Sequence, residues 1–322
     1  MKSMKPELLA TIKRGSTIEV LHYGWICVLN KDNKIVYKKG NISNLVFLRS
    51  SLKPIQAIPI IENNIGISSK ELAIVCGSHS GSKKHLAVLN NFMKKHKLHI
   101  LDLRCGVHLP LDEGERNRLS VKNISPSLLH NNCSGKHLGM LAVCKKNNWD
   151  LKTYSNPNHP LQKAILKNMQ KLSCAKKMTI AVDGCGVPTF AMPLINIAKM
   201  FSNFTSGANR RHSKIISSMT KNPEFVGGKD QIDSEIMKCS KGRLLAKVGA
   251  EGIIVVAYKG SCAVVKIADG SPRARSFVIL KLLRKLNWLK ESEIKNSILH
   301  EILKGKIKNH ARKVVGEIKT VF

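Results

Sequence analysis

The residues best suited to chemistry lie first in the segment Arg49-Ser50-Ser51-Leu52-Lys53-Pro54-Ile55-Gln56, between a strand-like run and an apolar helical one. Proline has no amide hydrogen and is accepted in the first turn of a helix, so Pro54 predicts a helix that begins close to Ser50. Residues three apart face each other on a helix, which would let the Lys53 amine reach the Ser50 hydroxyl. A serine needs a neighbouring base to act as a nucleophile, and a desolvated lysine can supply one. The segment is therefore a candidate serine nucleophile with its own lysine base.

The spacing alone does not single out this pair. The same Ser-x-x-Lys pattern also occurs at Ser80/Lys83, Ser173/Lys176, Ser218/Lys221 and Ser292/Lys295. Serines and lysines are common on solvated surfaces, so a short pattern of this kind is a hypothesis that its context has to support.

Three further segments combine reactive side chains with turn residues. They are Gly77-Ser78-His79-Ser80-Gly81, Asn131-Asn132-Cys133-Ser134-Gly135-Lys136-His137 and Asp183-Gly184-Cys185-Gly186. Reactive side chains in a turn at the end of a strand are typical of functional sites. Cys133, His137 and the distant Cys185 could supply soft ligands to zinc. The alternative is that the cysteines are buried free thiols and that Ser134 only caps a helix.

Strand patterns occur near both ends of the chain, and helical patterns lie between them. Alternating apolar residues predict strands within 17–48, with a hairpin turn at 31–34, and at 178–182, 243–248, 252–258 and 262–268. Helices are predicted at 52–62, 84–97, 135–147, 160–172, 192–203, 208–220, 230–238 and 272–288, followed by a lysine-rich helical tail.

This order of elements predicts an α+β fold in a single domain, residues 1–322. Strands from the two chain ends, about 15–60 and 240–322, would form one antiparallel sheet covered by the late helix, and about 61–239 would form a mainly helical insertion. The active site would lie between these two parts. A Ser-x-x-Lys segment that opens the first helix after N-terminal strands resembles the arrangement in serine β-lactamases and penicillin-binding proteins.

The composition is strongly basic, with 54 Lys and Arg against 21 Asp and Glu and a net charge of +33. Charge alone favours a polyanionic partner. The basic residues are spread over the whole length, however, and no aromatic run resembles a platform for stacking bases. We therefore expect salt-sensitive, non-specific adhesion to polyanions and no specific nucleic-acid recognition.

The nine cysteines are an odd number scattered through the chain. This usage predicts reduced thiols and a cytoplasmic protein. Residues 1–14 lack the apolar core of a signal peptide. The best uncharged apolar run, Gly252 to Tyr258, is far shorter than the roughly 20 residues of a membrane helix, so no membrane association is expected.

Taken together, six motifs resemble the serine-dependent, thermolabile L-asparaginase II family, in the family's order and from about residue 15 to about 270. They are Arg49-Ser50-x-x-Lys53-Pro54-x-Gln56, Cys76-Gly77-Ser78-His79-Ser80, Arg104-Cys105-Gly106-x-His108, Cys133-Ser134-Gly135-Lys136-His137, Asp183-Gly184-Cys185 and Lys247-x-Gly249-Ala250. Each motif is weak alone, but six in the same order are a specific signal.

The resemblance implies a β-lactamase-like fold, a homodimer, and hydrolysis of L-asparagine to L-aspartate and ammonia. It implies two serine/lysine pairs, Ser50 with Lys53 and Ser78 with Lys247. We expect Ser50 to attack the substrate, because its lysine is on the same turn, and Ser78 to be co-catalytic.

The resemblance also implies a zinc site that includes a lysine, formed by Cys133, Lys136 and Cys185. The zinc would hold the pocket together or anchor the α-amino or carboxylate end of the substrate. The residues expected to contact the substrate are Arg49, His137 and Asp183.

Two other functions are alternatives. One is another amidase, or a penicillin-recognising hydrolase of the same fold. The other, from a different class, is a basic nucleic-acid-binding or structural protein that would tolerate loss of Ser50 and Lys53.

Overall fold

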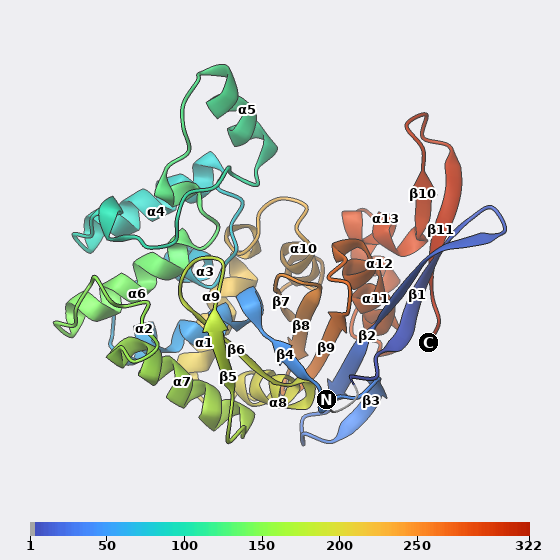
Figure 1. The fold of residues 1–322 in the computed structure, drawn as a ribbon, viewed down its shortest axis with the longest axis horizontal. Helices are drawn as coiled ribbons and strands as arrows, with labels where there is room; N and C mark the ends of the chain where they lie inside the picture. Colours follow the sequence, from blue (N-terminus) through green and yellow to red (C-terminus); the bar gives the residue numbers. More distant parts are fainter. Residues whose placement is uncertain (1–3) are drawn as a thin grey trace.

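The computed structural model describes residues 4–322, and its largest element is an antiparallel sheet of eight strands, ordered β10-β11-β1-β2-β9-β8-β7 with β3 paired to β2. Strands from the two ends of the chain lie side by side in this sheet, blue beside red and orange (Figure 1). This confirms the prediction of one antiparallel sheet built from both termini. Its strands are β1 (Glu7–Arg14), β2 (Thr17–Leu29), β3 (Ile35–Lys39), β7 (Leu245–Val248), β8 (Ile253–Tyr258), β9 (Ser261–Ile267), β10 (Lys306–Lys308) and β11 (Val314–Thr320).

The centre of the sheet is covered on both faces. Consecutive residues of a strand point to opposite faces, yet Ile253–Ala257 of β8 and Cys262–Val265 of β9 are all buried. Helices α8 (Leu194–Phe204) and α11 (Pro272–Lys285) both pack against these strands and supply the cover. The near-continuous apolar runs of β8 and β9 are the sequence counterpart of this double burial.

A second, three-stranded sheet brings two predicted site segments together. Its order is β4 (Leu45–Phe47), β6 (Pro188–Pro193) and β5 (Thr179–Val182). Both β4 and β5 run antiparallel to β6, so they run in the same direction and end at the same edge. The Ser50 segment follows β4 and the Asp183 turn follows β5, which places the two next to each other.

Most of the remaining helices form the mainly helical part, drawn from blue (α1, α2) through cyan and green to yellow and light brown (α9, α10) (Figure 1). Its central helix, α6, is buried along one continuous run from Ser134 to Cys144 and packs on α2, α3, α4 and α7, as expected of a helix that is apolar all round. The helices are α1 (Lys53–Gln56), α2 (Ile58–Glu62), α3 (Ser69–Val75), α4 (Lys83–Lys95), α5 (Glu113–Val121), α6 (Ser134–Lys146), α7 (Pro160–Ser173), α9 (Arg210–Lys221) and α10 (Ile232–Cys239), with the short 3₁₀ turns η1 (Arg49–Leu52), η2 (Ile100–Asp102), η3 (Leu128–His130) and η4 (Pro223–Phe225).

The lysine-rich tail departs from its prediction. Two short helices, α12 (Glu291–Ile294) and α13 (Ile298–Lys304), are followed by the hairpin β10–β11, which pairs with the unpredicted strand β1. The helical tail was therefore wrong beyond Gly305, which adopts a left-handed φ of +63° that ends α13. β-branched Val314, Val315, Ile318 and Thr320 then favour a strand.

The predicted helix at 52–62 is also interrupted. It is divided into η1, α1 and α2, and Pro59 stands in the first turn of α2. Proline removes a backbone hydrogen-bond donor, so the chain restarts its helix there instead of continuing the one before.

Within the described range of 4–322, no helix has both the length and the apolar character required to cross a membrane.

Candidate active site

Ser50 lies in the 3₁₀ turn η1, between the end of β4 and the start of α1. The turn is held from two sides, because Leu48 N donates to Phe190 O (3.0 Å) and Ser51 Oγ donates to Leu48 O (2.6 Å). Arg49, just before the serine, has a φ of +49°. Residues other than glycine rarely adopt this left-handed conformation, and such backbone strain clusters at functional sites.

Lys53 directs its amine into the interior and is 1% exposed. The amine donates to Gly77 O (2.6 Å), to Ser78 Oγ (3.0 Å) and to Asn132 O (3.1 Å). The structure therefore brings Lys53 together with Ser78. Burial lowers the pKa of Lys53, an effect that a charged Cys133 opposes and Lys136 reinforces.

Ser50 and Lys53 are joined through the backbone, since Lys53 N donates to Ser50 O. Among the described residues, no hydrogen bond links the Ser50 hydroxyl to the Lys53 amine. The amine turns instead toward two acceptors in the loop that follows α3, Gly77 O and Ser78 Oγ, and toward Asn132 O in the turn before α6. Helical spacing could not reveal this, because it takes no account of acceptors on other segments.

Lys247, on β7, forms a buried ion pair. Its Nζ lies 3.0 Å from Asp233 Oδ2, and neither side chain is exposed. The amine also donates to Val248 O (3.0 Å), and Val248 N donates back to Asp233 Oδ2 (3.1 Å). The resemblance implied a contact between Lys247 and Ser78, but the hydrogen bonds of Lys247 go to Asp233 and Val248.

Cys133, Lys136 and Cys185 lie together in the interior. Lys136 Nζ is 2.9 Å from Cys185 Sγ. A hydrogen bond from Cys185 holds the pKa of the Cys133 thiol well below its usual value, with Lys53 and Lys136 acting in the same direction against burial. Burial lowers the pKa of Lys136, but Cys133 and Cys185 raise it more, so the net shift is upward. The cluster thus combines thiolate character with a charged amine.

Arg49 and Asp183 contact each other, as expected from β4 and β5 ending at the same edge of the second sheet. Arg49 Nε donates to Asp183 Oδ1 at 2.7 Å. Burial acts to raise the pKa of Asp183, but the opposing effects of Lys136 and Arg49 are larger together, so the net shift of this pKa is downward. The pair links the turn before Ser50 to the turn that carries Cys185.

His137 is fully buried, and its Nδ1 lies 2.6 Å from the hydroxyl of Tyr154. Tyr154 in turn accepts a hydrogen bond from Arg104 N (3.0 Å). Burial keeps the pKa of His137 well below its usual value. The contacts of His137 therefore tie α6 to the loops beside it.

Two residues escaped the sequence interpretation. Asp233 lies in α10 without any local motif, 14 residues before its partner Lys247. Asn132 belongs to a quoted cluster, but its backbone oxygen, which accepts from Lys53, leaves no trace in side-chain patterns.

The three buried lysines differ in their partners. Lys247 has the carboxylate of Asp233, and Lys136 has the sulfur of Cys185. Lys53 has two carbonyl oxygens and one hydroxyl, all neutral. Burial is the largest influence on the pKa of Lys53 and lowers it, even though the nearby Cys133 acts in the opposite direction. Because burial disfavours the charged form of an amine, Lys53 is the lysine best placed to lose its proton and act as a base.

Comparisons with known proteins identify a family for this chain. The L-asparaginase II family model matches residues 10–320. Comparison with curated sequences gives no match. Among solved structures, a β-lactamase from Mycobacterium bovis is similar at 12% identity and a TM-score of 0.41, over 81% of this chain and 94% of its own. Because the family model spans nearly the whole sequence, the chain belongs to the L-asparaginase II family of asparaginase-type amidohydrolases.

Proposed function

We propose that the protein hydrolyses L-asparagine to L-aspartate and ammonia through an acyl-enzyme on a serine. The observation that carries this proposal is the hydrogen bond of the buried Lys53 amine to Ser78 Oγ at 3.0 Å. It joins a hydroxyl to a buried lysine that has no carboxylate partner within residues 4–322 and whose pKa is lowered by burial. Such a pair is what nucleophilic catalysis by serine requires.

In the first step, neutral Lys53 takes the proton of a serine hydroxyl while the serine oxygen attacks the side-chain amide carbon of asparagine. The C–N bond breaks, the lysine returns the proton to the leaving nitrogen, and ammonia departs. Water, deprotonated by the same amine, then attacks the ester and releases aspartate. Lys247, paired with Asp233, lies close enough to Lys53 to lower the pKa of its amine.

Two hydroxyls can use this base. Ser78 is hydrogen-bonded to Lys53, and we propose it as the co-catalytic group that holds the amine in place. Ser50 is the nucleophile in this proposal, because it directly follows Arg49, whose guanidinium group pairs with Asp183. Hydrogen bonds of catalytic groups often shorten only when the substrate is bound, so the unliganded geometry does not disqualify Ser50.

The thiol cluster suits zinc in its donor types. Zinc accepts thiolate sulfur and neutral nitrogen. Cys133, Lys136 and Cys185 supply two sulfurs and one nitrogen that lie together, and the Lys136 amine would give up its proton on binding the metal. Within residues 4–322, no group of three His, Cys, Asp or Glu side chains is gathered to bind a metal, so the amine of Lys136 would have to complete the set. A bound zinc would supply a positive charge to anchor the α-substituents of the substrate.

The test is release of ammonia from purified protein given L-asparagine or L-glutamine. We expect Ser50→Ala to abolish release without unfolding the chain, and Ser78→Ala to reduce it strongly. Ser292→Ala, from one of the other Ser-x-x-Lys patterns, is the matched control. Acid quenching during turnover and peptide mapping would locate the aspartyl ester. Full activity in Ser50→Ala, or an ester on Ser78, would remove Ser50 as the nucleophile.

We further propose a cytoplasmic homodimer. The dimer rests on the resemblance to the family, and the compartment rests on nine cysteines that are all free, with Cys174 exposed. Light scattering on purified protein would measure the mass of the assembly, and a monomer at working concentrations would contradict the dimer.

A further inference from the structure

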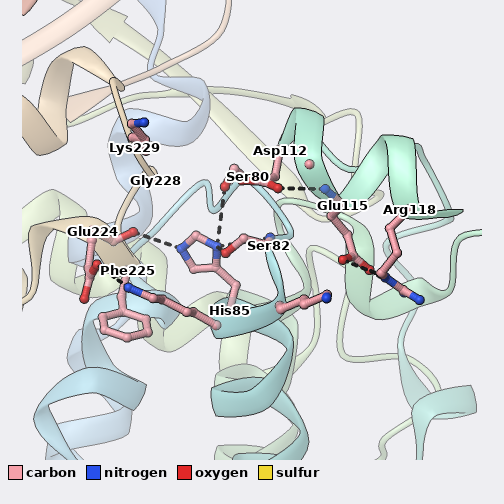
Figure 2. A pocket seen from close by; sticks show the side chains of 13 residues that line it. Ser80, Ser82, His85, Asp112, Glu115, Arg118, Glu224, Phe225, Gly228 and Lys229 are labelled. Atoms are coloured by element: carbon pink, nitrogen blue, oxygen red, sulfur yellow. Dashed lines mark hydrogen bonds and ion pairs between the residues drawn. The ribbon is translucent and has the colours of Figure 1, made fainter.

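A cavity of about 450 Å³ lies beside the Ser78 loop, and none of the catalytic or thiol residues described above lines it. Three segments form its walls: the loop into α4, the start of α5, and η4 with the loop after it (Figure 2). The volume falls within the range of small-molecule sites. Its lining residues are Ser80, Ser82, Lys83, Lys84, His85, Asp112, Gly114, Glu115, Arg118, Glu224, Phe225, Gly228 and Lys229.

Two opposite sides of this cavity each carry one acidic and one basic side chain. Glu224 and Lys229 stand on one side, and Asp112 and Arg118 on the other (Figure 2). A ligand with only negative or only positive charge would therefore meet groups of its own sign. A compact zwitterion can satisfy both, which is the pattern expected of electrostatic complementarity.

Some of the charged side chains around the cavity are already paired, and others are not. The buried carboxylate of Glu115 binds Arg118 at 2.6 Å. Lys84 and Glu224 form only a loose pair at 3.6 Å. Within residues 4–322, Lys83 and Lys229 have no ion pair. Their amines can receive a carboxylate, while Glu224 can receive an ammonium group.

His85 closes the inner end of the cavity and is fixed by its neighbours. Nε2 donates to Glu224 O (2.9 Å), which leaves Nδ1 to accept from Ser82 Oγ (2.8 Å). The ring thereby ties the start of α4 to η4, with Phe225 packed edge-on against it. These hydrogen bonds hold the floor of the cavity in place. The rings of His85 and Phe225 offer an aromatic surface to an apolar side chain of the ligand.

The cavity walls also hold the loop that carries Ser78. Ser78 N donates to Val226 O (2.7 Å), next to Phe225 in the wall. Asp112 N donates to Ser80 O (2.8 Å), two residues beyond Ser78. A ligand that draws these walls together would therefore shift the Ser78 hydroxyl relative to Lys53.

We propose that this cavity binds a free α-amino acid, with Lys83 and Lys229 on its carboxylate and Glu224 on its ammonium group, and that occupancy adjusts the Ser78 loop. The proposal that an amino acid binds depends only on the cavity, whereas the proposed effect on turnover also rests on the proposed function. The site is thus a regulatory site for an amino acid other than the substrate.

Binding is tested by calorimetric titration of the full chain with single L-amino acids, excluding asparagine, aspartate, glutamine and glutamate, which could enter the active site. At least one should bind once per chain. Its amide and its N-acetyl derivative, which each lack one charge, should bind at least tenfold more weakly. Lys229→Met and Glu224→Gln should each weaken binding tenfold or more. Lys238→Met, an exposed lysine outside the cavity, should leave it unchanged.

The proposal is overturned if no amino acid binds, if either singly charged derivative binds as well as the parent, or if adenosine monophosphate binds more tightly than every amino acid. It is also overturned if both cavity variants, shown to be folded by thermal melting, bind like the wild type. For the ligand that binds, the KM or kcat for asparagine should change at least twofold in the wild type and not in Lys229→Met. Binding with no asparagine hydrolysis at all would leave the site standing and refute the proposed function instead.

Discussion

Lys53 places its buried amine 3.0 Å from the hydroxyl of Ser78, and its other acceptors are two backbone carbonyl oxygens. Lys247, equally buried, has the carboxylate of Asp233 at the same distance. Two lysines of one site thus differ in charge balance. The pKa of Lys53 is lowered by burial, which suits it to lose a proton, whereas Lys247 is held in an ion pair with a carboxylate.

Replacing Lys53 should remove the base. We expect Lys53→Met to lower kcat for asparagine by about 10²–10⁴-fold, the usual contribution of a general base. Lys53→Arg should be as inactive, because a guanidinium stays protonated. Lys295→Met, an exposed lysine in another Ser-x-x-Lys pattern, is the control. Steady-state ammonia release measures all three, and near-normal turnover in Lys53→Arg would show that the base is another group.

Breaking the Asp233–Lys247 pair should destabilise the fold. Asp233→Asn leaves a buried ammonium without its counter-charge, and Lys247→Met leaves a buried carboxylate. Each should lower the free energy of unfolding by about 3–5 kcal/mol. The double variant should lose clearly less than the sum, since neither charge remains. Denaturant unfolding of the four proteins measures this coupling, and strictly additive losses would mean that the two charges do not stabilise each other.

The sequence was sufficient for the elements whose patterns are local. The hairpin at 31–34, the late strands and the helices at 84–97, 135–147 and 160–172 are set by alternation, amphipathic spacing and turn residues. The terminal hairpin was missed because β10 has only three residues, two of them lysine, and because the apolar residues of β11 alternate only over a short run. Their pairing with β1 is a long-range contact without a local signal.

In the candidate site too, local features could be predicted from the sequence and long-range contacts could not. The residue types of the site were evident from the motifs, and the second sheet explains why Arg49 and Asp183 meet. The partner of each lysine was not predictable, because it depends on which loop packs over which amine. Asp233 carried no motif at all, and only the packing of α10 on β7 brings it to Lys247.

Gly77 should tolerate no side chain. A Cβ at this position would lie 2.6 Å from Val226 O and 2.8 Å from Phe225 O, both backbone atoms. Gly77→Ala should therefore cost about 1–3 kcal/mol of stability. It should also lower activity, because Gly77 O and Ser78 Oγ both bind the Lys53 amine. Gly66→Ala, with open space around it, is the control. Unchanged unfolding and turnover in Gly77→Ala would show that the loop can move away freely.

The thiol cluster should retain zinc during purification. Elemental analysis of the wild type should find zinc bound to the chain, and Cys133→Ser and Cys185→Ser should each lose most of it, because an alcohol is a poor replacement for a thiolate ligand. Cys174→Ser, which alters an exposed cysteine, should keep the wild-type content. Equal zinc in the wild type and Cys133→Ser would remove Cys133 as a ligand.

Buried neutral histidine should make the fold sensitive to mild acid. His79 Nε2 donates to Ser134 Oγ (3.0 Å), since the Ser134 hydroxyl itself donates to Leu129 O. His79 Nδ1 is buried and has no hydrogen-bond partner among residues 4–322. Burial holds the pKa of His79 well below the ordinary 6.5. The unfolded chain therefore binds a proton that the folded chain does not, and stability falls as pH drops below about 6.5, by up to about 1.4 kcal/mol per pH unit for this residue. Denaturant unfolding between neutral pH and pH 5 should show a shallower decline in His79→Gln, and the exposed His310→Gln should follow the wild type. An equal slope in all three proteins would mean that His79 takes up its proton as readily in the folded chain as in the unfolded one.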